Sequence, residues 1–95
     1  MKKDEFTKLL ESDSNTLLID IREAEELEHS DNLPGTQHIS MGKMFTEAVN
    51  DKLPKDTQMV VFCRTGVRAE IVARELRERG YDIDGLEGGL NALNN

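Results

Sequence analysis

The sequence predicts an α/β protein whose mainly parallel sheet of four to five strands is flanked by helices. Two short apolar runs, Leu17 to Ile19 and Met59 to Cys63, are continuous rather than alternating. Such runs are typical of strands buried on both faces of a parallel sheet. Segments with helical spacing separate them, which indicates strand–helix–strand units. The length of 95 residues predicts one domain spanning residues 1–95.

The first half of the chain is expected to supply two helices and two strands. Phe6, Leu9 and Leu10 have helical spacing. The acidic segment 23–29 suits a helical turn or two, because glutamates near a helix start meet the positive end of its dipole. In chain order we expect a helix at 5–10, a strand at 17–21, helical turns at 23–29, a turn at 33–35 and a short strand at 37–40.

The second half is expected to alternate in the same way. Ile71, Val72 and Leu76 form the apolar stripe of a helix, and Gly80 stands where a C-terminal cap belongs. In chain order we expect a helix at 44–49, a strand at 59–63, a helix at 68–79, a short strand at 81–86 and a last helical turn after 89.

Composition excludes several function classes. The formal net charge of −7 argues against binding to nucleic-acid phosphates. No apolar run approaches the ~20 residues of a membrane span, and no secretion signal is recognisable. A single cysteine allows no internal disulfide, so we expect a cytoplasmic protein. Neither a metal nor a cofactor is expected, since one cysteine with His29 and His38 makes no zinc site.

The candidate site is the loop that follows the strand at 59–63. Ligands of parallel sheets bind at the carboxyl ends of strands, where Cys63 lies. A tight turn containing Gly66, followed by a helix start, can direct several backbone N–H groups at one anion. Arg64 and Arg68 add positive charge. This environment favours the thiolate form of Cys63.

A stabilised thiolate with room for one further atom can carry sulfur. It attacks the outer sulfur of a donor, and the remainder of the donor leaves as an anion. A thiophilic acceptor then removes the sulfur from the resulting persulfide of Cys63. The sequence therefore predicts covalent catalysis in two steps, with no general base required.

Four motifs in order resemble the rhodanese family, from about residue 17 to the end of the chain. They are a strand ending in Asp-x-Arg (Asp20 to Arg22), a Pro-Gly turn (Pro34 and Gly35), a Cys-x-x-Gly-x-Arg loop (Cys63 to Arg68), and closing segments at 80–81 and 86–90. The resemblance implies a rhodanese fold and a sulfurtransferase of the thiosulfate:cyanide type.

The resemblance also implies roles for single residues. Cys63 would carry the sulfur, and the loop around it comprises Arg64, Thr65, Gly66, Val67 and Arg68. Arg64 and Arg68 would contact a small anionic donor such as thiosulfate or a persulfide. The acceptor would be cyanide or a thiol, including a thiol-containing protein. Asp20 and Arg22 are expected to form an ion pair that is structural or lines the pocket.

The chain departs from the family pattern, and other interpretations are open. Ala69 stands where the family often has serine, Asn32 replaces a histidine, and Leu93 replaces an aromatic residue. The glutamates at 23–28 are interpreted as a solvated face. A rhodanese-like phosphatase is disfavoured, because its Cys-x5-Arg loop is one residue longer than the loop from Cys63 to Arg68. The alternative function is a non-catalytic interaction or sulfur-carrier module.

Overall fold

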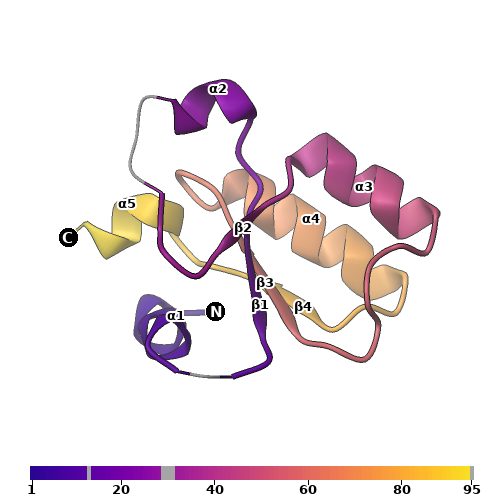
Figure 1. Cartoon of the computed structure of the whole chain (residues 1–95), viewed down its shortest axis with the longest axis horizontal. Helices are drawn as coiled ribbons and strands as arrows, with labels where there is room; N and C mark the ends of the chain where they lie inside the picture. Colours follow the sequence, from indigo (N-terminus) through magenta and orange to yellow (C-terminus); the bar gives the residue numbers. More distant parts are fainter. Residues whose placement is uncertain (13, 29–31, 95) are drawn as a thin grey trace.

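A computed structural model describes residues 1–12, 14–28 and 32–94 (Figure 1). Four parallel strands form one sheet in the order β2-β1-β3-β4, with helices on both faces. The strands are β1 (Leu17–Asp20), β2 (Gln37–His38), β3 (Met59–Phe62) and β4 (Ile83–Gly85). The helices are α1 (Lys3–Leu10), α2 (Ala24–Leu27), α3 (Met41–Val49), α4 (Val67–Glu78) and α5 (Gly89–Leu93). The predicted α/β class with a parallel sheet is confirmed.

The central strand β3 explains why the apolar runs are continuous. It pairs with β1 on one side and β4 on the other, and all four of its residues are buried. Successive side chains of a strand point to opposite faces, so a strand covered on both faces needs apolar residues throughout. The register aligns Asp20 with Phe62. The carboxyl ends of β1 and β3 therefore lie side by side, immediately before Cys63.

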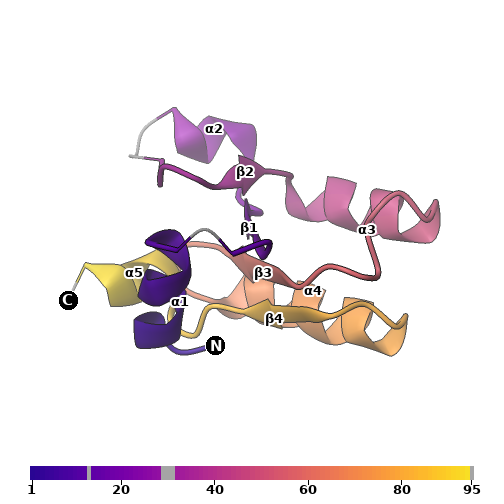
Figure 2. The ribbon, with the colours of Figure 1, turned by 60° about the horizontal axis from the view of Figure 1, so that its bottom comes forward.

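Two apolar clusters cover the two faces of the sheet. In β1 and β3, Ile19 and Val61 belong to one cluster and Leu18 and Val60 to the other. Helices α3 and α4 cover the first face, and α1 and α5 lie together over the second (Figures 1 and 2). Leu90 of α5 belongs to this second cluster. The C-terminal helix is thereby anchored beside the end of β3.

Several predicted elements have different bounds in the structure. The predicted strand at 81–86 shortens to Ile83–Gly85, and the predicted strand at 37–40 shortens to two residues. Helix α4 starts at Val67, one residue early, because Gly66 precedes it with a positive φ of 97°. The acidic helix covers only Ala24–Leu27, and His29, at the end of its predicted range, lies outside the described residues.

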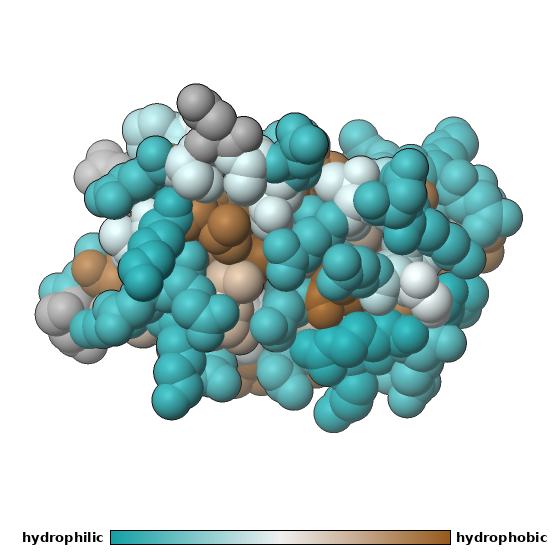
Figure 3. All heavy atoms as spheres, turned by 90° about the horizontal axis from the view of Figure 1, so that it is seen from below, coloured by the Kyte–Doolittle hydropathy of each residue, from teal (hydrophilic) through white to brown (hydrophobic). Residues whose placement is uncertain are grey.

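The surface seen from below is mainly hydrophilic, with apolar side chains visible in small separate patches (Figure 3). Val49 and Val67 are the large apolar residues most exposed in the described part of the chain. Within the same residues, no helix combines the length and apolar character needed to cross a membrane.

Replacement of Phe6 tests how α1 is held on the sheet. The fully buried ring of Phe6 lies 5.4 Å from that of Phe62, edge to face at 72°. We expect Phe6→Ala to lower the free energy of unfolding by about 3 kcal/mol, because it leaves a cavity and removes an aromatic pair. Urea denaturation measures this loss. Val49→Ala, at a side chain that is 59% exposed, is the control and should change stability by less than about 0.5 kcal/mol. A similarly small loss for Phe6→Ala would contradict this packing.

Candidate active site

Cys63 follows β3 directly and is the centre of the candidate site. Its side chain is fully buried. The backbone N–H of Gly66 donates a hydrogen bond to the Sγ atom over 3.2 Å. The loop after β3 therefore curls back over the sulfur, as the spacing of Cys63 and Gly66 predicts.

Helix α5 determines which groups of the loop face the sulfur. The N–H of Leu90 donates to the carbonyl oxygen of Cys63 over 2.9 Å, and the N–H of Asn91 donates to that of Arg64 over 3.0 Å. In a trans peptide the carbonyl and the following N–H point in opposite directions. Because both carbonyls turn toward α5, the N–H groups of Arg64 and Thr65 turn away from α5. The loop thus offers donors, rather than acceptors, on its other side.

Two glycine sites allow this close approach of loop and helix. Gly66 (φ 97°) and Gly89 (φ 59°) both have the left-handed backbone that favours glycine. A Cβ atom on Gly66 would stand 2.9 Å from the Gly88 nitrogen, and one on Gly89 would collide with the carbonyl oxygens of Cys63 and Arg64. From the sequence, Gly88 and Gly89 are noticed as the lead into a last helical turn and as part of the family resemblance. Only the tertiary structure shows that these two glycines pack directly against the Cys63 loop.

Helix α4 begins directly after the loop that carries Gly66. The N–H groups of Val67, Arg68 and Ala69 belong to its first turn, where a helix has no acceptors of its own and its dipole is positive. Ala69 is fully buried, and its carbonyl oxygen would lie 3.2 Å from a Cβ atom placed on Gly85. Thr65 is exposed, and its hydroxyl lies 3.5 Å from the Val67 nitrogen.

Arg68 lies close to Cys63, but its guanidinium is bound by Glu26 of α2. Two hydrogen bonds join the pair, from Nη1 to Oε2 over 2.7 Å and from Nη2 to Oε1 over 2.9 Å. The interpretation of residues 23–28 as a solvated face is therefore wrong for Glu26. The sequence does hold one signal that Glu26 makes specific contacts. Glu23 and Glu26 are three positions apart, and they form a capping box at the start of α2. The partner of Glu26 is 42 positions away in the sequence.

The pair changes the acid–base properties of both side chains. The hydrogen bond from Arg68, assisted by that from the Glu23 backbone, lowers the pKa of Glu26 from 4.5 to about 2. The hydrogen bond to Glu26 raises the pKa of Arg68, and the nearby Cys63 sulfur adds to this rise. Arg68 thus lies between two acidic groups and interacts with both Glu26 and the Cys63 sulfur.

Asp20 and Arg22 form the expected ion pair at the end of β1. Nη2 of Arg22 lies 2.8 Å from Oδ2 of Asp20, and the Arg22 backbone N–H donates to Oδ1 over 3.0 Å. The Arg22 side chain is fully buried. His38, exposed on β2, lies with Nε2 2.7 Å from the Arg22 carbonyl oxygen.

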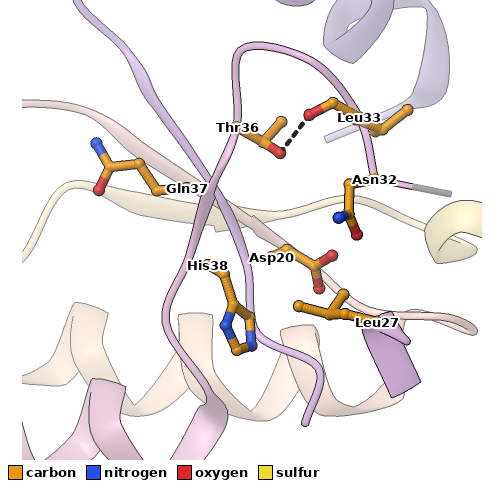
Figure 4. A pocket seen from close by; sticks show the side chains of 7 residues that line it. All are labelled: Asp20, Leu27, Asn32, Leu33, Thr36, Gln37 and His38. Carbon is orange, nitrogen blue, oxygen red and sulfur yellow. Dashed lines mark hydrogen bonds between the residues drawn. The ribbon is translucent and has the colours of Figure 1, made fainter. Parts of the chain in front are cut away.

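Asp20 also borders a small cavity of about 110 Å³ between α2 and β2 (Figure 4). Its lining comprises Asp20, Leu27, Asn32, Leu33, Thr36, Gln37 and His38. In this close view the Asp20 carboxylate lies near Asn32 and Leu27. Cys63 is not among the described residues that line this cavity.

The structure thus brings together Cys63, the loop amides and Arg68, with Arg22 close enough for its charge to act on Glu26. Arg64 is half-buried, and within residues 1–12, 14–28 and 32–94 its side chain has no hydrogen bond or ion pair. In the same ranges no three His, Cys, Asp or Glu side chains converge as metal ligands.

The sequence model of the rhodanese-like domain family matches residues 2–95. The chain belongs to the rhodanese-like family. Solved structures agree with this assignment. A rhodanese-like domain protein from Staphylococcus aureus is 26% identical with a TM-score of 0.80, covering 97% of this chain and 87% of its own. A rhodanese homologue from Thermus thermophilus is 26% identical with a TM-score of 0.69, and 97% of each chain is covered.

Relatives of this rhodanese-like domain carry names that refer to sulfur transfer. The tRNA sulfurtransferase of Desulfurococcus amylolyticus is 38% identical over 80% of this chain, which spans only 14% of that protein. YtwF of Bacillus subtilis, whose name provisionally assigns it as a sulfurtransferase, is 36% identical over 87% of this chain and 78% of its own length. These names support a function of the sulfurtransferase type in general.

In this rhodanese-like domain, the contribution of Glu26 to stability should depend on pH. A carboxyl whose pKa is lowered on folding stabilises the folded state above its unfolded pKa of about 4.5, and this stabilisation disappears as the pH falls toward 2. Both side chains are about one-third exposed, so the pair is worth about 0.5–1 kcal/mol. We expect Glu26→Gln to lose this amount at neutral pH.

Urea denaturation of both proteins at a series of pH values measures this dependence. The difference in unfolding free energy between wild type and Glu26→Gln should shrink steadily below about pH 4.5. Glu25→Gln, at an exposed position of the same helix, is the control for removal of one charge. A difference that stayed constant down to about pH 2 would show that ionised Glu26 is not its source.

Proposed function

We propose that this rhodanese-like domain is a sulfurtransferase that moves a sulfane sulfur through a persulfide of Cys63. The observation that carries the proposal is the hydrogen bond from the Gly66 N–H to the Cys63 sulfur, within a loop whose carbonyls are turned toward α5. A loop that presents N–H groups to a sulfur atom stabilises its anionic forms, which are the thiolate and the persulfide.

In the first step the Cys63 thiolate attacks the outer sulfur of the donor. With thiosulfate, a bond forms between Sγ and that sulfur, and the sulfur–sulfur bond of thiosulfate breaks. The electron pair of the broken bond leaves with sulfite. The total charge is unchanged, because a thiolate and a dianion become a persulfide anion and a sulfite dianion. The loop amides of residues 64–68 would hold the negative charge on either form of Cys63.

In the second step a thiophilic acceptor attacks the outer sulfur of the persulfide. Cyanide gives thiocyanate, and a thiolate gives a new persulfide. The bond to Sγ breaks, and its electron pair returns to Cys63 as the thiolate. No proton needs to be removed from Cys63 in either step if it starts as the thiolate, which fits the lack of a histidine at this loop.

The remaining residues have supporting roles in this proposal. Arg64, whose side chain is not engaged elsewhere in the described part of the chain, would meet the donor anion, and Arg68 would stabilise the sulfur anion. Thr65 and Val67 shape the loop. The buried pair of Asp20 and Arg22 would be structural. Residues 1–95 would act as one domain, and a catalytic thiolate suits the reducing cytoplasm.

A sulfur-carrier or interaction module is the second candidate. It is favoured by the complete burial of Cys63, which hinders repeated access by small substrates. A Bacillus subtilis relative, YrkF, also has a name that refers to a sulfur carrier, with 30% identity over 80% of this chain and 40% of its own length. A carrier would take up one sulfur from thiosulfate and release it slowly to cyanide or thiols, whereas an enzyme turns over repeatedly.

Replacement of the nucleophile tests the role of Cys63. We expect Cys63→Ser to lose all thiosulfate:cyanide sulfurtransferase activity, because a hydroxyl forms no persulfide. Mass spectrometry after incubation with thiosulfate should show one added sulfur atom in the wild type and none in the variant. Circular dichroism and the unfolding midpoint establish that the variant is folded. Activity in folded Cys63→Ser well above background would refute the role of Cys63.

The size of the loop predicts which group it can hold. A single sulfur atom fits a short ring of N–H donors, whereas a phosphoryl group needs a wider one. We therefore expect no hydrolysis of an aryl phosphate by the wild type. Insertion of one glycine between Gly66 and Val67 should slow sulfur transfer by about 100-fold, because it shifts donors that must be placed to within an ångström.

The insertion keeps Cys63 and both arginines, so it tests geometry rather than residue identity. Rates with thiosulfate and with an aryl phosphate are measured side by side for the wild type and the variant. Wild-type hydrolysis of the phosphate at a rate comparable to sulfur transfer would show that loop size does not select the substrate.

A further inference from the structure

We propose that Glu26 determines donor specificity by neutralising Arg68, so that the site disfavours dianionic donors and accepts donors whose sulfur-bearing end carries at most one negative charge. Persulfides of thiols belong to this accepted class, and thiosulfate to the disfavoured one. The inference rests on the proposed transfer of sulfur through Cys63 and names the donor class for it.

The contact between Glu26 and Arg68 uses both Nη atoms, which are the atoms with which Arg68 could hold a donor anion at two points. Both Nη atoms of Arg68 donate to Glu26, one to each carboxylate oxygen, over 2.7 and 2.9 Å. Two parallel charge-assisted hydrogen bonds form the strongest common arrangement of these groups. A donor anion must displace the Glu26 carboxylate before it can make the same contact. Glu26 thus competes with the substrate for Arg68.

The charges near the sulfur lead to the same conclusion. Because its pKa is about 2, Glu26 is ionised at any neutral pH. The positive charges of Arg64 and Arg68 are then balanced by Glu26 and the Cys63 thiolate. Arg22, the other cation near Glu26, is paired with Asp20. The site therefore has no surplus positive charge for a dianion.

The surface beside the loop adds further negative charge. A groove of about 390 Å³ borders the outside of the loop, with Gly66 and Val67 in its wall. Glu70 and Glu87 also line it. The whole chain carries a net charge of −7. An approaching dianion is repelled by this field about twice as strongly as a monoanion of similar size.

A persulfide donor reacts in the same way but brings less charge. The Cys63 thiolate attacks the terminal sulfur of the donor R–S–SH. A bond forms between Sγ and that sulfur, and the sulfur–sulfur bond of the donor breaks. The electron pair leaves with the thiolate R–S⁻, and the proton stays on the transferred sulfur. No oxidant or reductant is needed.

Two synthetic donors that differ in charge provide the test. Thiosulfate is a dianion that releases sulfite, and benzenethiosulfonate is a monoanion that releases benzenesulfinate, while both leave the same persulfide on Cys63. The second-order rate of persulfide formation is measured by mass spectrometry in single turnovers. Glu26→Gln is the variant of choice, because glutamine at this position still accepts the Glu23 N–H in a capping box.

We expect Glu26→Gln to raise the rate with thiosulfate about tenfold and the rate with benzenethiosulfonate less than about threefold. Glu25→Gln removes the same charge from an exposed position of the same helix and should change both rates by less than about twofold. In an Arg68→Ala background the gain from Glu26→Gln should vanish, because the two residues act as a pair.

Two results would overturn the proposal while leaving sulfur transfer intact. Equal changes with both donors would show that Glu26 does not discriminate by charge. A slower rate with thiosulfate in Glu26→Gln would show that Glu26 only positions Arg68. If neither donor formed a persulfide on wild-type Cys63, the proposed function itself would fail, and the inference with it.

Discussion

The contact between the Cys63 loop and the start of α5 is the constraint on which the rest of the site depends. Two backbone N–H groups of α5 bind the carbonyls of Cys63 and Arg64. Each of these bonds fixes the direction of the following peptide, so the sulfur side of the loop is left with N–H donors. The contact requires glycine on both sides, at Gly66 and Gly89, because a side chain at either position would strike backbone. The direction of these N–H groups thus depends on backbone geometry rather than on the side chains of the loop.

Charge at the carboxyl edge of the sheet is arranged in pairs rather than as a positive patch. Asp20 neutralises Arg22 in the interior, and Glu26 neutralises Arg68 beside the sulfur. The first pair is buried, and either charge would be costly there without the other. The second pair is partly exposed, so it contributes less to stability than a buried pair with the same geometry would. In the proposed function, this arrangement would let an acidic protein hold a sulfur anion at the loop without a large positive patch.

Much of the site could be predicted from local sequence. Cys63 at the end of an apolar run, followed by glycine and arginine, indicates a strand, a tight loop and a helix start, and the structure places all three there. The ion pair of Asp20 and Arg22 follows from two positions close together in the chain. The contact of Glu26 with Arg68 could not be predicted in this way. An acidic segment normally faces solvent, and the capping box accounts only for the contacts between Glu26 and Glu23. The exact lengths of β2 and β4 also escaped prediction, since short edge strands depend on pairing.

By itself, the sequence determined the order of strands and helices along the chain, the parallel sheet and the position of Cys63 at the end of a strand. These follow from periodicity and from residues adjacent in the chain, which act over one or two turns of backbone. Only the tertiary structure decided that α5 binds the loop carbonyls and that Glu26 accepts hydrogen bonds from Arg68, which is 42 positions away in the sequence. Such contacts arise because the sheet brings the ends of distant segments to one edge, and no local pattern of hydrophobicity or charge specifies which of them will meet.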